Sequence, residues 1–165
     1  EKCWLNKYAS YCTLKNLNDG LPWFKWKIHD IPRSVSIDRP KVVQFLFYIQ
    51  WQNLKKICTT MGIQLIGDMP IYVGYDSADV WSNRELFQVS SNGEIKFQAG
   101  CPPCEYEENG QIWGNPLYNW QTHEKHKFSW WKKRFQKLFE RVDIVRLDHF
   151  IGFSKFYKIK RMHRL

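Results

Sequence analysis

The sequence predicts an α/β fold that forms part of a (β/α)8 TIM barrel, with long insertions on the catalytic face. Two short apolar segments with β-branched residues, 63–66 and 142–147, are typical of buried strands. A helical pattern precedes each segment, and a long polar connection follows the first, as in a βαβ unit. A complete barrel needs about 250 residues. We therefore expect this chain of 165 residues to be a fragment of one catalytic domain, residues 1–165.

Three helices are predicted from apolar positions that recur every three or four residues. The first ends at Asn18–Gly20, and its apolar positions are Trp4, Leu5, Tyr8, Tyr11, Cys12 and Leu14. The second spans Lys41–Met61 and ends at Gly62, with apolar positions Val42, Phe45, Leu46, Ile49, Leu54 and Ile57. The third spans Phe128–Glu140 and is expected to bury Trp131, Phe135, Leu138 and Phe139.

Carboxylates stand just past the ends of both predicted strands. Asp68 follows Ile66, and Asp148 follows Leu147, with Arg146 two residues earlier. Catalytic groups lie at the carboxyl ends of barrel strands, and a nearby arginine keeps a carboxylate ionised, as a nucleophile requires. Two other interpretations remain open from these residues alone. Arg146 and Asp148 could form a buried structural pair, and Asp68 could cap a turn.

The segment between the strands, from about residue 70 to residue 125, has turn residues at Asn92-Gly93, at Asn109-Gly110 and at 114–116. It is predicted to be one long irregular loop. Loops of this length in a compact domain are usually functional.

Composition and charge argue against several classes of protein. The net charge is +9, and basic residues gather at 125–137 and 158–165, but no nucleic-acid-binding motif accompanies them. The longest apolar stretch, Val42–Ile49, is too short to cross a membrane. No export signal is visible, and the cysteines have the pattern of small apolar residues, so we expect a cytoplasmic protein. A plastid is the alternative in a eukaryote, because a targeting segment would precede Glu1.

Other catalytic motifs are absent or incomplete. Cys101 and Cys104 have CxxC spacing, but no helix start follows them and no second pair offers a zinc site. His123 and His126 precede a helix and are expected to be solvated. The sequence has no glycine-rich phosphate loop and no G-x-S-x-G motif. We therefore expect neither a cofactor nor a metal.

Several motifs together resemble amylomaltase, the 4-α-glucanotransferase (disproportionating enzyme) of glycoside hydrolase family 77. The resemblance covers nearly the whole chain, and the spacing between its motifs also agrees. The motifs are Gly67–Val73, Asp76–Trp81, Glu85–Phe87, Ala99–Pro103, Gly110–Tyr118, Val145–Phe150 and Gly152–Phe153, and the match extends upstream to Trp4-Leu5, Tyr8-Ala9 and Pro22-Trp23.

The resemblance implies a retaining transfer of α-1,4-glucan segments to the 4-hydroxyl of another glucan or of glucose. Asp148 would be the nucleophile that forms the covalent glycosyl-enzyme, and Arg146 would position it and keep it ionised. Asp68 would hydrogen-bond the sugar in the cleaved subsite, Trp113 would line adjacent subsites, and His149 would contact sugar hydroxyls. The partners would be maltooligosaccharides, with no nucleic acid, no membrane and an undetermined oligomeric state.

Two departures from the family pattern affect these expectations. The loop that corresponds to the family's mobile loop, Gly100–Ile112, contains Cys104-Glu105-Tyr106-Glu107-Glu108 where an aspartate and aromatic residues are usual. The family's acid/base glutamate and its second aspartate lie on strands later than any found here. We therefore expect the 165 residues to be inactive alone. A glucan hydrolase, a non-catalytic maltooligosaccharide-binding remnant and a basic nucleic-acid-binding module are the alternatives, of which only the transferase accounts for the spacing of the motifs.

Overall fold

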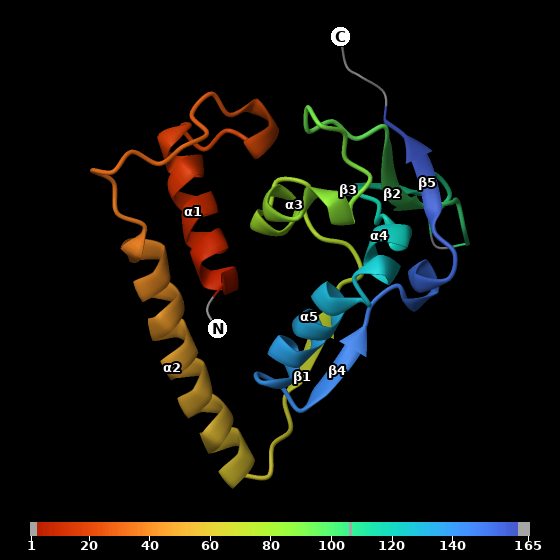
Figure 1. The fold of residues 1–165 in the computed structure, drawn as a ribbon. Coiled ribbons are helices and arrows are strands. Elements are labelled where there is room, and N and C mark those ends of the chain that lie inside the picture. Colours follow the sequence, from red (N-terminus) through yellow and green to blue (C-terminus); the bar gives the residue numbers. More distant parts are fainter. Residues whose placement is uncertain (1–2, 106, 162–165) are drawn as a thin grey trace. The chain divides into compact units, whose positions relative to one another are not determined.

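The computed structural model describes residues 3–105 and 107–161 of the chain (Figure 1). It contains α-helices together with a parallel strand pair and an antiparallel sheet, which confirms the α/β class. The described residues form two compact units. The first comprises the chain up to Gly67 together with Lys133–Arg146, and the second comprises Asp68–Lys132 together with the chain from Leu147 onward.

Helix α1 (Cys3–Leu17) confirms the first predicted helix, including its end. Asp19 and Gly20 have φ angles of 54° and 74°, and the Gly20 amide donates to the Lys15 carbonyl at 2.8 Å. This left-handed turn is the usual way in which a glycine ends a helix. Buried Asn18 fastens the turn to the following loop, since its amide nitrogen donates to the Leu14 and Ile28 carbonyls. A 3-10 turn, η1 (Trp23–Lys25), lies in that loop.

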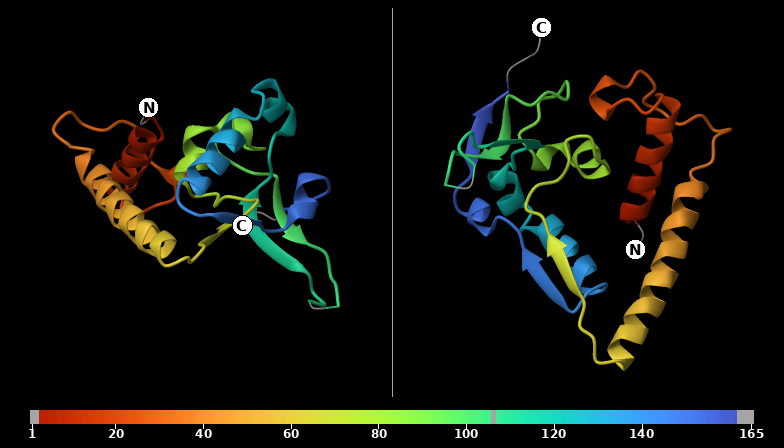
Figure 2. Two further views of the ribbon diagram at one scale, coloured as in Figure 1. Left: turned by 90° about the horizontal axis from the view of Figure 1, so that it is seen from below. Right: turned by 180° about the vertical axis from the view of Figure 1, so that it is seen from behind.

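Helix α2 (Asp38–Thr60) confirms the second predicted helix and begins three residues earlier than expected. It contacts α1, as the two views in Figure 2 also show. No residue of α2 is buried against the described residues, and Phe45 and Ile57 are 54% and 56% exposed. Among the described residues, none of the helices has the length and apolar character needed to cross a membrane.

Strands β1 (Ile66–Met69) and β4 (Ile144–Leu147) pair with each other. The Leu65 carbonyl accepts from the Ile144 amide, and the Met69 carbonyl accepts from the Asp148 amide, so both chains advance in the same direction. The pair is therefore parallel. The expectation of two buried strands was wrong, because exposed and less exposed residues alternate along both and Ile66 is 69% exposed. The first strand also begins where its predicted range ends, so Asp68 lies within it.

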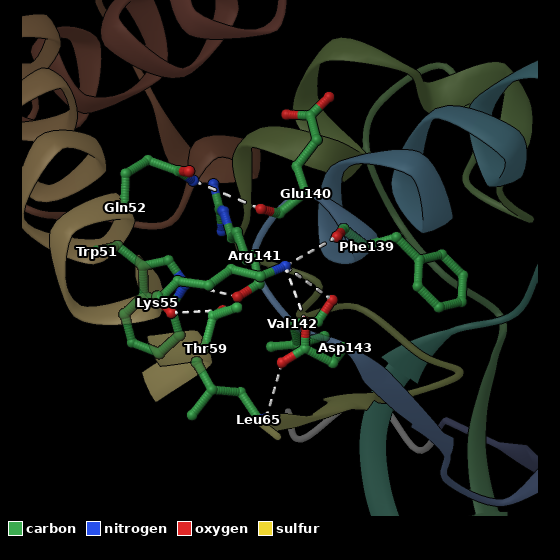
Figure 3. A network of polar contacts seen from close by, with 10 residues as sticks. All are labelled: Trp51, Gln52, Lys55, Thr59, Leu65, Phe139, Glu140, Arg141, Val142 and Asp143. Carbon is green, nitrogen blue, oxygen red and sulfur yellow. Dashed lines mark hydrogen bonds and ion pairs between the residues drawn. The ribbon is translucent and has the colours of Figure 1, made fainter. Parts of the chain in front are cut away.

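Helix α5 (Ser129–Phe139) precedes β4 and confirms the third predicted helix. Trp131 is buried as expected, but Phe135 and Leu138 are only half-buried and Phe139 is 52% exposed, which corrects the prediction for these three residues. Side chains of α2 bind the backbone that follows α5 (Figure 3). Trp51 Nε1 donates to the Arg141 carbonyl at 2.8 Å, and Lys55 Nζ donates to the Phe139 and Val142 carbonyls at 3.5 and 3.3 Å. Lys55 also forms an ion pair with Asp143, whose carboxylate accepts from the Leu65 amide.

The segment after β1 is not the single irregular loop that the sequence predicted. It contains the short helices α3 (Ala78–Ser82) and α4 (Trp120–Lys125), the 3-10 turn η2 (Arg84–Leu86), and the strands β2 (Phe97–Cys101) and β3 (Gln111–Pro116). Strand β2 lies between β3 and β5 (Tyr157–Lys160) in an antiparallel sheet. The core of this second unit includes Val80, Leu86, Phe87, Ile95, Ala99, Leu117 and Tyr118.

Candidate active site

The two predicted carboxylates lie at the same end of the parallel strand pair. Asp68 is the third residue of β1, and Asp148 directly follows β4. The Asp148 amide donates to the carbonyl of Met69, the residue after Asp68, at 3.2 Å. Both residues are exposed. Because the carboxyl ends of parallel strands are where α/β enzymes hold their reacting groups, this edge of the pair is the candidate active site.

Arg146 is exposed and lies on β4, two residues before Asp148. Side chains alternate along a strand, so Arg146 is expected to share a face with Ile144 and with the start of the following turn. Its exposure argues against the buried structural pair that the sequence left open. Its action on Asp148 stays a prediction.

The two rings predicted to contact sugar meet at the residue that follows Asp148 in the chain. The rings of Trp113 and His149 are 4.9 Å apart and nearly perpendicular, at 88°. Trp113 comes from β3, and its indole nitrogen donates to the Gln111 side chain at 2.8 Å. His149 is the residue after Asp148 and begins η3 (Phe150–Phe153) in a left-handed conformation, with φ 49° and ψ 47°. The structure thus brings together residues that are far apart in the sequence.

Two tyrosines that were not predicted as site residues complete this group of rings. Tyr72 stacks on Tyr118 with centroids 5.9 Å apart and an interplanar angle of 14°, and it also contacts Trp113 and His149. Burial raises the pKa of the Tyr72 phenol to about 12, so this group is uncharged at neutral pH. Both tyrosines lie inside motifs already singled out, in 67–73 and 110–118, and membership of those motifs was the available indication.

The loop Gly100–Ile112 is a hairpin connection whose ends are paired, with Gly100 opposite Ile112 in β2 and β3. Cys104 and Glu107 exchange backbone hydrogen bonds at its tip, at 3.0 and 3.1 Å. Cys101 and Cys104 are free thiols. The atypical acidic residues Glu105 and Glu108 are exposed, and Tyr106 lies outside the described residues.

The expectation that His123 is solvated was wrong, although His126 is exposed. The His123 side chain has 0% exposure and packs against the rings of Tyr118, Trp120 and Trp130. Burial lowers its pKa, against a smaller opposing effect of the Leu86 backbone. In the part of the chain that the structure describes, His, Cys, Asp and Glu side chains form no group of three that could hold a metal ion.

Comparison with known proteins supports the same class of enzyme. A family profile described as 4-alpha-glucanotransferase matches residues 1–164. The chain therefore belongs to the 4-alpha-glucanotransferase family. It is 38% identical to the 4-alpha-glucanotransferase of Streptococcus pneumoniae serotype 4 over 94% of this chain, and 39% identical to that of Thermus thermophilus over 96%. It is 37% identical to a Solanum tuberosum relative named as chloroplastic/amyloplastic, over 94% of this chain.

Solved structures agree with the sequence relatives. Amylomaltase from Streptococcus agalactiae in complex with acarbose superposes with a TM-score of 0.87 at 35% identity, over 95% of this chain and 34% of that one. Amylomaltase from Corynebacterium glutamicum, at 18% identity and a TM-score of 0.75, shows the same fold over 96% of this chain and 22% of that one. The chain spans about a third of the length of the curated relatives that it matches, 34% for the streptococcal and Thermus proteins and 29% for the potato protein.

Proposed function

We propose that this chain carries the nucleophile of a retaining 4-α-glucanotransferase that acts on maltooligosaccharides and other α-1,4-glucans. The observation that supports it most directly is the place of Asp148, at the carboxyl end of β4 and directly before His149, whose ring contacts that of Trp113. Flat rings bind the apolar faces of sugars, and a carboxylate beside them can reach an anomeric carbon. The similar streptococcal amylomaltase was solved with acarbose, which is consistent with a sugar at this edge.

The proposed reaction has two displacements. In the first, an Asp148 oxygen attacks C1 of the donor sugar, the bond from C1 to the leaving O4 breaks, and a general acid protonates that oxygen. In the second, the 4-hydroxyl of the acceptor attacks C1, gives its proton to the same group acting as base, and releases the Asp148 carboxylate. Asp68 would hydrogen-bond the donor sugar, and Arg146 would keep Asp148 ionised.

The general acid/base is not assigned to any of the 165 residues. From the resemblance to the family, we propose that it belongs to a later strand of a (β/α)8 barrel that includes β1, α5 and β4. No cofactor is needed for this chemistry. By analogy with the relatives, we propose the cytoplasm or a plastid as its compartment, the latter because the potato relative is named as chloroplastic/amyloplastic.

Asp148 can be tested without the acid/base residue by using α-maltotriosyl fluoride as donor. Fluoride leaves with the electron pair of the C1–F bond and needs little protonation. Without a general base to activate water, the ester that forms would be hydrolysed slowly. The purified chain should gain the mass of one maltotriosyl group, located by peptide mass spectrometry on Asp148. Asp148→Asn should abolish the gain, whereas Glu124→Gln, at an exposed site on α4, should label as the wild type does.

Two results would contradict the proposal. Labelling of another carboxylate would reject Asp148 as the nucleophile. Binding of maltotriose without any labelling would instead support the non-catalytic binding remnant, particularly if Asp148→Asn left that binding unchanged.

A further inference from the structure

Tyr72 occupies the centre of the group of rings beside Asp148. Its ring centroid lies 6.0 Å from that of Trp113, 6.5 Å from that of His149 and 5.9 Å from that of Tyr118. Trp113 and His149 also contact each other, so the three rings of Tyr72, Trp113 and His149 touch pairwise. Whatever fixes the Tyr72 ring therefore limits how the other two can turn.

The backbone on both sides of Tyr72 is held by side chains that follow β3 or belong to it. The buried Tyr118 hydroxyl donates to the carbonyl of Ile71, and Asn115 Nδ2 donates to the carbonyl of Val73 at 2.8 Å. Tyr118 is 2% exposed, and its ring stacks on that of Tyr72. Tyr72 is thus fixed through its backbone and through one ring face.

His149 needs such support because its own backbone is unfavourable. A residue with a side chain rarely adopts the left-handed conformation seen here, at φ 49°, and it stays there only when its surroundings hold it. The Gly152 amide donates to the His149 carbonyl at 2.9 Å. A side chain at residue 152 would collide with the His149 ring, since an added Cβ would lie 2.9 Å from its Cδ2. The ring is therefore confined between Gly152 on one side and Trp113 and Tyr72 on the other.

We propose that Tyr72 is a positioning residue, whose ring holds Trp113 and His149 in the perpendicular arrangement that receives the donor sugar next to Asp148. This inference rests on the function proposed above and adds a residue to it. The aromatic ring performs this role, and the hydroxyl is dispensable, because all three contacts are made by ring faces and edges. Phenylalanine at position 72 should therefore preserve the arrangement of Trp113 and His149, whereas leucine should not.

The test compares Tyr72→Phe and Tyr72→Leu with the wild type in the labelling of Asp148 by α-maltotriosyl fluoride. Tyr72→Leu should raise the fluoride concentration for half-maximal labelling about tenfold, as expected for the loss of one or two aromatic contacts. Its labelling rate at saturation should fall less, because Tyr72 does not touch the reacting atoms. Tyr72→Phe should stay within about twofold of the wild type for both quantities.

Tyr75→Leu is the matched control, because this tyrosine is only three residues away but its ring lies under Arg161 and its hydroxyl donates to Gly93. It should leave the concentration dependence unchanged. Equal labelling by Tyr72→Leu and the wild type would overturn the proposal. So would a Tyr72→Phe variant as impaired as Tyr72→Leu, since the hydroxyl would then act directly.

A second measurement needs no chemistry and separates this inference from the proposed function. The indole N–H resonance of Trp113, identified by its loss in Trp113→Phe, should shift in Tyr72→Leu and stay in place in Tyr72→Phe. If the wild type is not labelled on Asp148 but the Trp113 resonance still shifts in Tyr72→Leu, Asp148 is rejected as the nucleophile. The role of Tyr72 in placing the Trp113 ring is then retained. Unchanged Trp113 resonances in Tyr72→Leu would reject that role whatever the labelling shows.

Discussion

Lys55→Met should destabilise the chain by loosening the turn between α5 and β4. The Lys55 ammonium donates to the Phe139 and Val142 carbonyls, at 3.5 and 3.3 Å, and lies 3.3 Å from an Asp143 carboxylate oxygen. Carbonyls beyond the end of a helix have no partner within it, so side chains or water must satisfy them. Methionine keeps the apolar stem of lysine and removes only the charged donor.

The expected loss is about 1 kcal/mol of unfolding free energy. Each hydrogen bond to a carbonyl contributes about 0.5–1.5 kcal/mol net, and the lower end applies to two such long bonds. The ion pair with Asp143 should add little, because both side chains reach water, with exposed fractions of 21% and 30%. For a chain of this length, about 1 kcal/mol corresponds to a fall in melting temperature of roughly 2–4 °C.

Urea unfolding followed by circular dichroism measures this difference, with Lys56→Met as the control because Lys56 is exposed on the same helix. The measurement should be repeated at high salt. A loss that persists there is due to the carbonyls, whereas a loss that vanishes is due to the ion pair. Equal stability of Lys55→Met and Lys56→Met would refute the capping role of Lys55.

Three further predictions concern packing and protonation. Gly100→Ala should cost about 1–3 kcal/mol or more, measured by thermal unfolding, because an added Cβ would collide with the Gln111 carbonyl oxygen across the β2–β3 pair. The unfolding free energy should decrease as pH falls below about 6.5, the ordinary pKa of histidine, because burial lowers the pKa of His123 and the unfolded chain takes up that proton first. His123→Phe should flatten this part of the plot of stability against pH; an unchanged slope in that variant would exclude His123 as the cause. A second decrease in stability should begin as pH falls below about 4. The hydrogen bond from the Leu65 amide, and to a lesser extent Lys55, lowers the pKa of Asp143 below its ordinary 3.8, so the unfolded chain is protonated first. Asp143→Asn should be less stable at neutral pH and should lose this second decrease in stability.

Local patterns predicted the helices well. The apolar positions of α1 and the glycine that ends it lie close together in the sequence, and both the helix and its end at Asn18–Gly20 were confirmed. The same holds for the existence of α2 and α5. The apolar spacing could not predict how much of each helix is buried, because the elements that pack against a helix determine which of its faces is covered.

Strand positions depended on partners elsewhere in the chain. The apolar run 63–66 indicated a strand, but pairing with β4 places it at Ile66–Met69. Strand β2 was missed altogether, since it pairs with β3 across the hairpin and with β5 near the end of the described residues. Short segments of mixed polarity become strands only when such partners supply their hydrogen bonds.

The sequence alone was sufficient for the α/β class, the family, and the candidate carboxylates Asp68 and Asp148, because each depends on short patterns read along the chain. Only the tertiary structure placed Trp113 against His149, brought Tyr72 into contact with both and buried His123 among aromatic rings. The physical reason is that these contacts join segments distant in sequence, and which rings meet is decided by strand register and backbone hydrogen bonds that no local pattern encodes.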